Sequence, residues 1–553
     1  MKTKHTLTLF CFLLSMVTFG QESSDAEVRA LHDETPDDPY VAVDKSLMPR
    51  QPAYSFIGSS YFTTQVNVDA EGNDIIGDAG NEPSLAVDPT NNDRIVVGWR
   101  QFDAIASNFR QAGYGYSLDG GATFTFPGVI NPGVFRSDPV LDFDANGNFY
   151  YNSLQGTFAC DVYKIEDGGV DWTGPFPAFG GDKQWMRLDR TGGIGDGHNY
   201  SNWNSAFTTC SPGYFTRSTD GSTTFENCIT IDGNPFWGTL AVDAAGDLYI
   251  SGRSGASNVL VKSTTAKDAG SAVTWDFATT VNMGGSVAAG LPINPSGLAG
   301  QLWVDVDLNN NNVYMLASVI PTGGGDPIDV MFAKSTDGGA TFAAPVRINT
   351  DPLGNYNWFG TLSVAPNGRI DVIWLDTRDD NGGLDSVLYY AFSTDEGETW
   401  LYNQPISDSF DPTIGYPNQS KMGDYFDMKS DNDHAHIAWC NTLNGGQDVY
   451  YTRITPSLLG VGDLAVNPFN VSVSPNPVTQ ETVISFEVAS ESKTEVAVYD
   501  VQGKKVYSLL NEVVSGPQRI SWNTLDKEQF NSGIYFVTIA TGDLKSVAKV
   551  VVK

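Results

Sequence analysis

One short motif occurs four times in the middle of the chain and constrains its fold more than any other feature. Every copy has Ser, Asp, Thr and an aromatic residue at its first, third, seventh and eighth positions. Asp and Gly favour a tight turn, and the Asp and Ser side chains can accept hydrogen bonds from nearby backbone amides. The motif therefore predicts a repeated strand–turn–strand unit in which the Asp is structural. The four structural residues are Asp119, Asp220, Asp337 and Asp395.

A second pattern alternates with this motif and consists of a strand, a turn rich in Asp, Asn and Gly, and another apolar strand. Its seven copies begin at Pro83, Pro139, Gln184, Gly238, Gln301, Gly360 and Gly423. A spacing of roughly 40–60 residues is typical of four-stranded propeller blades. We therefore predict an all-β chain with a seven-bladed β-propeller. Pairing of residues near 61–68 with residues near 449–454 would close the ring and remove its open edges.

The four motifs resemble the Asp-box repeat, also called the bacterial neuraminidase repeat. The resemblance implies a sialidase-like propeller that acts on complex glycans. Asp-box sialidases have six blades, an arginine triad, an Arg-Ile-Pro motif and a Tyr/Glu nucleophile pair. This chain has seven units and no Arg-Ile-Pro, so the sialidase residues cannot be transferred to it.

The last part of the chain has a different pattern, carried by residues 473–477, 498–504, 532–535 and 549–553. Residues 468–553 resemble the type IX secretion C-terminal sorting domain. The resemblance implies export through the periplasm, with the secretion machinery as a partner, to the outer-membrane surface or the medium. Alternating Val, Ile and Phe with Gly turns independently predict a small β-sandwich.

The remaining segments complete the predicted organisation. Residues 1–20 have a basic start and a short apolar core, as in a signal peptide, and no later stretch is apolar enough to cross a membrane. We expect an N-terminal extension over 21–60, the propeller over 61–455 and a linker over 456–467. The net charge of −33 argues against nucleic acid as a partner, because the two polyanions would repel each other.

Propeller geometry places ligands over the central axis, on the face from which the innermost strands begin. Carboxylates there can act as acid, base or nucleophile, and aromatic rings can stack on sugars. The predicted catalytic residues are Glu82, Asp138, Asp424 and Tyr425. The predicted ligand-binding residues are Trp185, Trp237, Trp303, Trp358, Arg100, Arg253 and Arg378. The same residues could instead plug the channel and brace the blades.

Two functions therefore remain open, both with a polysaccharide or glycoconjugate ligand. The first is a secreted glycoside hydrolase of sialidase-like type, which needs two carboxylates, or a Tyr and a carboxylate, near one sugar. The second is a non-catalytic surface propeller that binds glycan or protein, and a plugged centre would favour it. A polysaccharide lyase is a further alternative.

Cysteine and histidine residues give the last expectations. Cys210 and Cys228 flank adjacent antiparallel strands of the third unit and are the best disulfide pair. His434 and His436 fall on one face of a strand, where a packed pair is expected rather than a metal site. No cofactor or metal is predicted.

Overall fold

A computed structural model describes the chain from residue 36 onward, except for residues 460–468, 470, 502, 525–529 and 542–543. The chain divides into two compact units. One runs to Pro456, and the other comprises residues 457–553 together with residues 58–60. The predicted signal peptide and most of the predicted linker lie outside the described residues.

Seven antiparallel sheets follow one another along the described part of the first unit. Sheet one contains β5 (Ala79–Val87), β6 (Ile95–Phe102), β7 (Gln111–Ser117) and β8 (Thr125–Ile130). Sheet two contains β9 (Ser137–Phe143), β10 (Phe149–Leu154), β11 (Cys160–Ile165) and β12 (Thr173–Pro177). Sheet three contains β13 (Trp185–Leu188), β14 (Asn199–Asn202) and β15 (Phe215–Ser218). Sheet four contains β16 (Leu240–Val242), β17 (Leu248–Ser254), β18 (Ser257–Ser263) and β19 (Phe277–Val281).

The other three sheets continue the series. Sheet five contains β23 (Trp303–Val306), β24 (Val313–Pro321), β25 (Asp329–Ser335) and β26 (Val346–Arg347), with β20 (Gly285–Val287) paired to the far end of β24. Sheet six contains β27 (Asn357–Val364), β28 (Ile370–Asp376), β29 (Val387–Ser393) and β30 (Leu401–Pro405). Sheet seven contains β31 (Asp427–Ser430), β32 (Ala435–Asn441) and β33 (Asp448–Ile454), followed outward by β3 (Tyr61–Gln65) and β2 (Ser55–Ile57).

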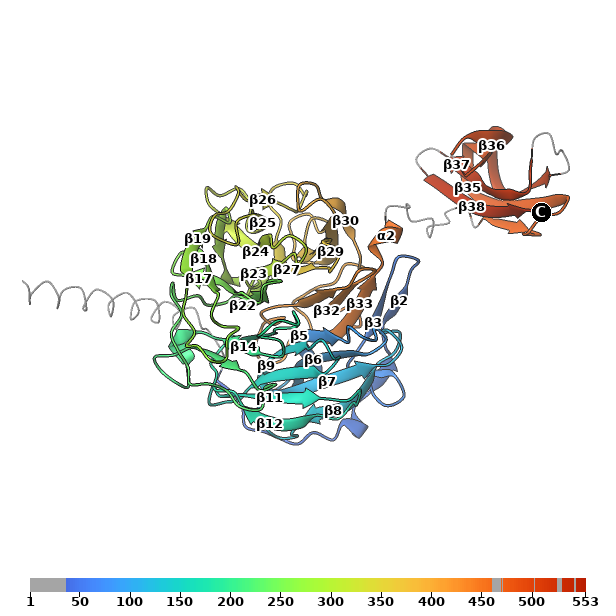
Figure 1. Ribbon diagram of the computed structural model, residues 1–553. Coiled ribbons are helices and arrows are strands. Elements are labelled where there is room, and N and C mark those ends of the chain that lie inside the picture. The colour runs from blue at the N-terminus through green and yellow to red at the C-terminus, as the bar shows by residue number, and fades with distance from the viewer. Residues whose placement is uncertain (1–35, 460–468, 470, 502, 525–529, 542–543) are drawn as a thin grey trace, which may run out of the picture. The chain divides into compact units, whose positions relative to one another are not determined.

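The first strands of these sheets form a closed ring. Each packs against the first strand of the next sheet, in the order β5, β9, β13, β16, β23, β27 and β31, and β31 packs against β5 again. The sheets are consistent with propeller blades, and Figure 1 shows them following one another from blue to orange. Apolar side chains are buried between neighbouring sheets, including the fully buried Trp99, Trp374 and Trp439.

The two ends of the ring meet in sheet seven. Strand β3 pairs antiparallel with β33, with Tyr61 opposite Ile454 and Gln65 opposite Tyr450. This pairing confirms the predicted closure. It is visible in Figure 1, where the blue β3 lies beside the orange β33. An additional edge strand, β2, covers the outer side of β3.

The Asp-box turns have one repeated hydrogen-bond pattern. In the third copy, Asp337 Oδ1 accepts from the Ser335 hydroxyl at 2.8 Å and from Thr341 N at 2.9 Å, and Asp337 Oδ2 accepts from the Thr341 hydroxyl at 2.6 Å. The turn requires positive φ at Gly338 and Gly339, 68° and 86°. Asp119, Asp220 and Asp395 bond in the same way within their own boxes. The Asp side chain therefore accepts hydrogen bonds from backbone N–H groups that have no backbone partner in the turn.

Because of these hydrogen bonds, we expect the contribution of Asp337 to the free energy of unfolding to depend on pH. Hydrogen bonds from Thr341 and Ser335 lower the pKa of Asp337 from 3.8 to about 2. A carboxyl whose pKa is lower in the folded state contributes stability above its unfolded pKa, and that contribution is lost as the pH falls toward the folded pKa. Asp337→Ala should therefore lower the free energy of unfolding by about 1 kcal/mol at pH 7, and the deficit should shrink toward pH 2. Urea unfolding across this pH range measures both, and a deficit that does not depend on pH would contradict the prediction.

Sheet three lacks a regular fourth strand among its described residues. In its place Ile229 forms an isolated bridge with Phe215, and Glu226 N donates to Arg217 O. A disulfide bond joins Cys210 and Cys228, whose Cα atoms lie 6.2 Å apart. It fixes this segment to the sheet where strand pairing is short. The other two cysteines of the described chain, Cys160 and Cys440, are free and buried.

Smaller elements lie outside the seven sheets. They are the 3-10 helices η1 (Lys45–Leu47) and η2 (Ser205–Phe207), the pair β1 (Arg50–Pro52) and β4 (Asn73–Ile75), the hairpin β21 (Ala289–Leu291) and β22 (Asn294–Leu298), and α2 (Pro456–Leu459). Among the described residues, no helix is long and apolar enough to cross a membrane.

The second unit is a small sheet bent over its own core. Its strands are β34 (Ser472–Ser474), β35 (Glu481–Tyr499), β36 (Lys505–Asn523), β37 (Gly533–Thr541) and β38 (Leu544–Val552). The first half of β35 pairs with β34 and its second half with β37, and a bulge separates the two halves. This bend lets both halves cover buried residues such as Trp522, Val496 and Val550.

Candidate functional site

The backbone is strained where five of the innermost strands begin. At each of these positions a residue other than glycine has a φ between 46° and 57°. These residues are Glu82, Asp138, Lys183, Trp237 and Phe359. Such a conformation costs on the order of 1–3 kcal/mol and persists only where surrounding contacts hold it. For the first three residues, those contacts include a cluster of charges.

Six charged side chains meet at this end of the axis, and we call them the axial charge cluster. The members are Glu82, Arg100, Asp138, Lys183, Lys421 and Asp424. Lys183 Nζ lies 2.8 Å from Asp424 and 3.5 Å from Asp138, and Lys421 Nζ lies 2.9 Å from Asp424. Arg100 Nε lies 3.1 Å from Glu82. The structure thus brings the three predicted catalytic carboxylates together, each opposed by a cation.

The members of the axial charge cluster are buried, and none is more than 6% exposed. Burial raises the pKa of Glu82 well above its ordinary value, although Arg100 opposes the shift. Burial would also raise the pKa of Asp424, but Lys183 and Lys421 outweigh it and hold that pKa well below its ordinary value. A buried carboxylate with two bound ammonium groups is stabilised as an anion and has little access to a substrate.

The predicted aromatic residues are buried near the same end. Trp185 packs edge-on against both Trp303 and Tyr425, with ring centroids 5.2 Å apart in each pair. The Tyr425 hydroxyl donates to Pro139 O at 2.8 Å, and burial raises the pKa of this hydroxyl well above its ordinary value. Trp237 and Trp358 are 3% and 0% exposed. The catalytic and ligand-binding roles stay predictions, but these positions match the plugged channel that was the alternative.

The predicted arginines have separate surroundings. Arg100 belongs to the axial charge cluster, whereas Arg253 donates to the carbonyl groups of Gly255 and Val287. Arg378 pairs with Asp376 at 2.6 Å. These arginines therefore bond within different parts of the ring.

A hairpin that the sequence analysis did not detect contacts the cluster. Strands β21 and β22 lie in the chain between β20 and β23 of sheet five, yet Leu298 N donates to Asp424 Oδ1 at 2.8 Å. Asn294 donates to Gly423 O and accepts from Met422 N. The hairpin therefore bridges to the start of sheet seven and contributes to the burial of this end. Its only sequence signal was an irregular stretch rich in Gly and Pro between two repeats.

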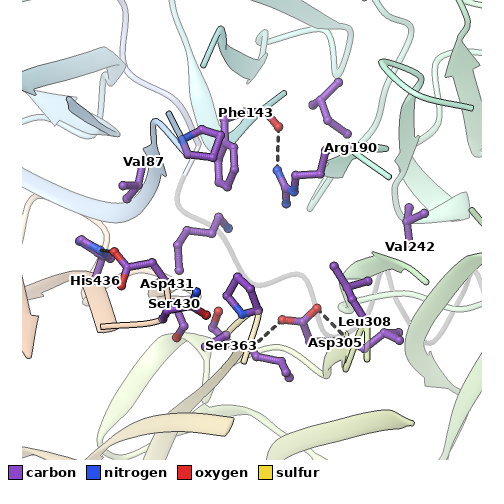
Figure 2. Close-up of a pocket in the computed structure, with 18 of the residues that line it drawn as sticks. Val87, Phe143, Arg190, Val242, Asp305, Leu308, Ser363, Ser430, Asp431 and His436 are labelled. Carbon is purple, nitrogen blue, oxygen red and sulfur yellow. Dashed lines mark hydrogen bonds and ion pairs between the residues drawn. The ribbon is translucent and has the colours of Figure 1, made fainter. Parts of the chain in front are cut away.

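A cavity of about 440 Å³ lies at the opposite end of the innermost strands. The last residue of every innermost strand lines it, so all seven sheets contribute. These residues are Val87, Phe143, Leu188, Val242, Val306, Val364 and Ser430. Figure 2 shows Arg190 and Phe143 on one side of this axial cavity, with Asp305, Leu308 and Asp431 across from them. The cavity is on the face of the Asp, Asn and Gly turns, not on the face where the sequence analysis placed ligands.

Charged side chains alternate with the apolar lining of the axial cavity. Arg187, Arg190 and Lys429 line it and surround the buried Asp142. Burial would raise the pKa of Asp142, but these three cations outweigh it and lower that pKa. Arg190 stacks over the Phe143 ring at 3.9 Å and is 24% exposed, so its outer face can meet a ligand.

These residues had a signal in the sequence that was not used. Arg187, Asp305 and Lys429 each stand one residue before the end of an innermost strand. Because side chains alternate across a strand, this shared position directs them to the same layer of the ring. A charged residue inside a short apolar strand is costly to bury, and its recurrence at one register position could have indicated an axial site.

A smaller cavity of about 190 Å³ reaches Asp138 from the other face. Asp37, Arg110, Phe135 and Asp182 also line it. Arg110 forms an ion pair with Asp37 of the N-terminal extension at 2.6 Å. This cavity therefore lies under the extension and touches one of the predicted catalytic carboxylates.

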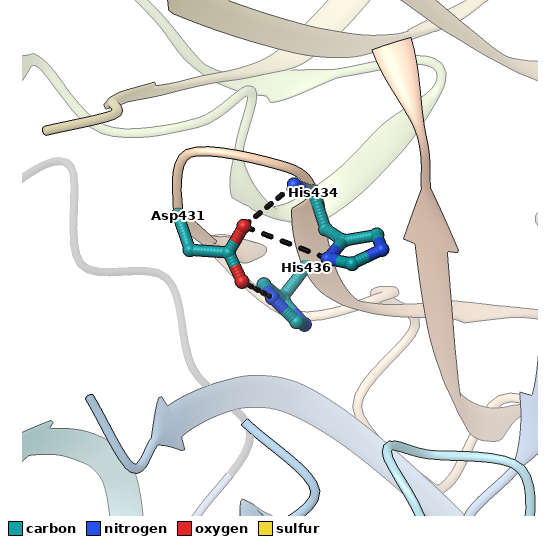
Figure 3. Close-up of side chains that lie close together, drawn as sticks. All are labelled: Asp431, His434 and His436. Atoms are coloured by element: carbon teal, nitrogen blue, oxygen red, sulfur yellow. Dashed lines mark hydrogen bonds and ion pairs between the residues drawn. The ribbon is translucent and has the colours of Figure 1, made fainter. Parts of the chain in front are cut away.

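A group of potential metal ligands lies at the rim of the axial cavity. Asp431, His434 and His436 each offer a ligand atom, and these atoms all lie within 4.8 Å of one another. Asp431 and His436 line the cavity, and Figure 3 shows the Asp431 carboxylate facing both rings. The sequence analysis identified the histidine pair but not Asp431, which follows β31 and comes close only through the turn.

Comparison with known families identifies the second unit. Residues 472–553 match the family described as "Secretion system C-terminal sorting domain". The protein therefore carries a type IX sorting domain and is secreted or displayed at the outer-membrane surface. No curated protein is significantly similar to the chain in sequence.

Solved structures show distant likeness to this chain. A protein of unknown function from Dyadobacter fermentans is 13% identical over 72% of this chain and 98% of its own, with a TM-score of 0.40. An α-L-arabinofuranosidase from Fusarium graminearum is 12% identical over 73% and 98%, with a TM-score of 0.37. A sialidase from Trypanosoma rangeli is 10% identical over 88% and 89%, with a TM-score of 0.35. Likeness at this level carries no conclusion about activity or substrate.

Proposed function

We propose that this protein is a secreted or surface-displayed seven-bladed Asp-box propeller that binds a complex glycan in its axial cavity without cleaving it. In this proposal residues 1–20 are the signal peptide, 21–60 an extension, 61–455 the propeller, 456–467 a linker and 468–553 the sorting domain. The observation that carries the proposal is the axial cavity itself, which is lined by the last residue of all seven innermost strands. Ligand pockets commonly form where many elements converge in this way.

The chemistry of the axial cavity suits a sugar. Its volume of about 440 Å³ falls within the range of small-ligand pockets, roughly 300–1,000 Å³. Sugar hydroxyls both donate and accept hydrogen bonds, and the cavity offers donors on Arg187, Arg190 and Lys429 and acceptors on Asp305. Phe143, Val242 and Leu308 supply apolar surface beside them. The three cations also favour a ligand that carries a carboxylate or sulfate.

The charge cluster at the opposite end supports binding over hydrolysis. A retaining or inverting glycosidase needs two carboxyl groups that reach one sugar. Glu82, Asp138 and Asp424 are at most 1% exposed and are paired with cations. In the axial cavity, Asp305 Oδ2 already accepts from Val364 N at 2.9 Å. Glu82, Asp138 and Asp424 therefore brace the blades, and Asp305 is left as an acceptor for a ligand.

Arg190→Gln tests the proposal. The substitution removes the cation beside the Phe143 ring. It should weaken binding of an anionic glycan by roughly 10- to 100-fold, which corresponds to the free energy of one hydrogen bond to a charged group. Isothermal titration of the purified protein with sialosides and uronic-acid oligosaccharides measures the change.

Arg94→Gln is the matched control, because Arg94 also pairs with an aspartate and lies over a phenylalanine ring, Phe149, at 5.1 Å, but does not line the cavity. It should bind glycan like the unchanged protein. Equal loss in both variants, or no binding of any glycan, would refute the cavity as the site. Release of sugar products that is lost in Asp424→Asn would instead establish the hydrolase.

A further inference from the structure

The turn between β31 and β32 differs chemically from its counterparts in the other sheets. In most sheets the residue after the innermost strand is an aspartate whose Oδ1 accepts from the backbone two residues further on, as Asp88, Asp144 and Asp243 do. Asp431 has the same role, because its Oδ1 accepts from Asp433 N at 2.7 Å and from His434 N at 2.6 Å. In this turn, two histidines follow the aspartate.

The second carboxylate oxygen of Asp431 faces a histidine nitrogen. His436 Nε2 lies 3.0 Å from Asp431 Oδ2, and His434 Nδ1 lies 3.5 Å from Asp431 Oδ1. His434 Nδ1 is buried and has no hydrogen-bond partner among the described residues. In a tetrahedral zinc site with bonds of about 2.0–2.1 Å, neighbouring ligand atoms lie about 3.3–3.4 Å apart. The separation of 3.0 Å between Asp431 Oδ2 and His436 Nε2 is close to that value, and the ligand atoms of the three residues all lie within 4.8 Å of one another.

The surroundings hold the turn and one ring in place. Arg369, from sheet six, donates to the carbonyl oxygens of Asp431, Asn432 and His434 at 2.9–3.0 Å. His436 Nδ1 lies 2.6 Å from the Tyr451 hydroxyl. Histidines that bind metal through one nitrogen usually bond a protein group through the other. Tyr451 supplies that group and leaves Nε2 directed at Asp431.

We propose that Asp431, His434 and His436 form a zinc-binding site at the rim of the axial cavity. His436 Nε2, His434 Nδ1 and Asp431 Oδ2 are the three protein ligands, and two imidazole nitrogens with one carboxylate oxygen is a donor set that Zn²⁺ accepts. Three protein ligands leave one coordination position for water or a ligand atom. Asp431 and His436 line the axial cavity, so that position is next to it. The site does not depend on the proposed glycan function, because its ligands bind metal whatever occupies the cavity.

Cobalt substitution tests the site without any assay of activity. The purified full-length protein, without an affinity tag, is stripped with a chelator and titrated with Co²⁺. Four-coordinate Co²⁺ absorbs visible light strongly, and one equivalent is expected to produce that spectrum and to be displaced by Zn²⁺. His434→Gln and Asp431→Asn should each weaken Co²⁺ binding by more than about 100-fold, and Tyr451→Phe by about 10-fold, the scale of losing an outer hydrogen-bond partner.

The variants are chosen so that the fold is kept. Asn at position 431 retains the Oδ1 acceptor that the turn uses, and His434 is partly exposed. Asp433→Asn is the matched control, since Asp433 is an exposed carboxylate of the same turn outside the ligand group, and it should bind Co²⁺ normally. Near-ultraviolet circular dichroism of each metal-free variant verifies folding. Absence of the spectrum in the unchanged protein, or its persistence in folded His434→Gln and Asp431→Asn, would overturn the proposal.

Discussion

Lys183→Met is expected to destabilise the ring by about 3–5 kcal/mol at pH 7, the cost of leaving buried charges without their partner. Lys183 Nζ lies within 3.5 Å of Asp138, Asp182 and Asp424. Methionine fills a similar volume but carries no charge, so these buried carboxylates would face one another with less compensation. Urea unfolding of the full chain, followed by near-ultraviolet circular dichroism, measures the loss.

The pH dependence of this loss distinguishes electrostatics from packing. Burial would raise the pKa of Asp424, but Lys183 is the largest of the groups that lower it below its ordinary value. A carboxyl with a lowered pKa contributes stability above its unfolded pKa of about 3.9, and the contribution is lost below it. The deficit of Lys183→Met should therefore be greatest near pH 7 and shrink below about pH 4. A packing defect would give a deficit that does not change with pH.

Lys262→Met is the control for Lys183→Met. Lys262 Nζ pairs with Asp247 at 2.9 Å, but its side chain is 15% exposed, compared with 5% for Lys183. An ion pair nearer to solvent is worth about 0–1 kcal/mol. If both variants lost a comparable free energy of unfolding, burial of the axial charge cluster would not explain the effect of Lys183→Met.

The repeats allowed most of the ring to be predicted because each physical requirement recurred. A strand must alternate its faces, a turn needs Asp and Gly at fixed places, and an open ring edge must be covered. Those rules located the Asp-box turns and the pairing of 61–68 with 449–454. They did not locate the hairpin β21–β22, because an insertion between two repeats follows no period. Nor did they indicate that the fourth strand of sheet three would be reduced to a bridge beside Cys228.

The candidate site was harder to predict for a different reason. Sequence position correctly indicated that Glu82, Asp138 and Asp424 approach one another, because all three stand where innermost strands begin. Their exposure depends on partners that the repeats do not reveal, namely Lys421, which precedes sheet seven, and the hairpin residue Leu298. Charged residues near the axis therefore have two roles. At one end they neutralise one another in a buried cluster, and at the other Arg187, Arg190 and Lys429 line the axial cavity.

Thr64→Pro should weaken closure of the ring by about 3 kcal/mol or more, because proline removes a ladder hydrogen bond inside a sheet and restricts the backbone. Gln65 N donates to Tyr54 O, toward β2, and Val66 N donates to Val449 O, toward β33. Successive N–H groups of a strand point to opposite sides, so the Thr64 N–H faces β33. Its loss weakens the pairing that joins the two ends of the ring, and separation of β3 would uncover the β33 edge and promote association.

Ile57→Pro separates this effect from proline strain in general. Ile57 lies opposite Phe62 in the edge strand β2, and the same alternation directs its N–H away from β3. Proline is tolerated at such edge positions, so Ile57→Pro should change the urea midpoint little and should elute like the unchanged protein in size-exclusion chromatography at the concentration where Thr64→Pro associates. If the two variants unfold at the same urea concentration, the β3–β33 pairing does not hold the ring closed, and stability must come from packing between the blades alone.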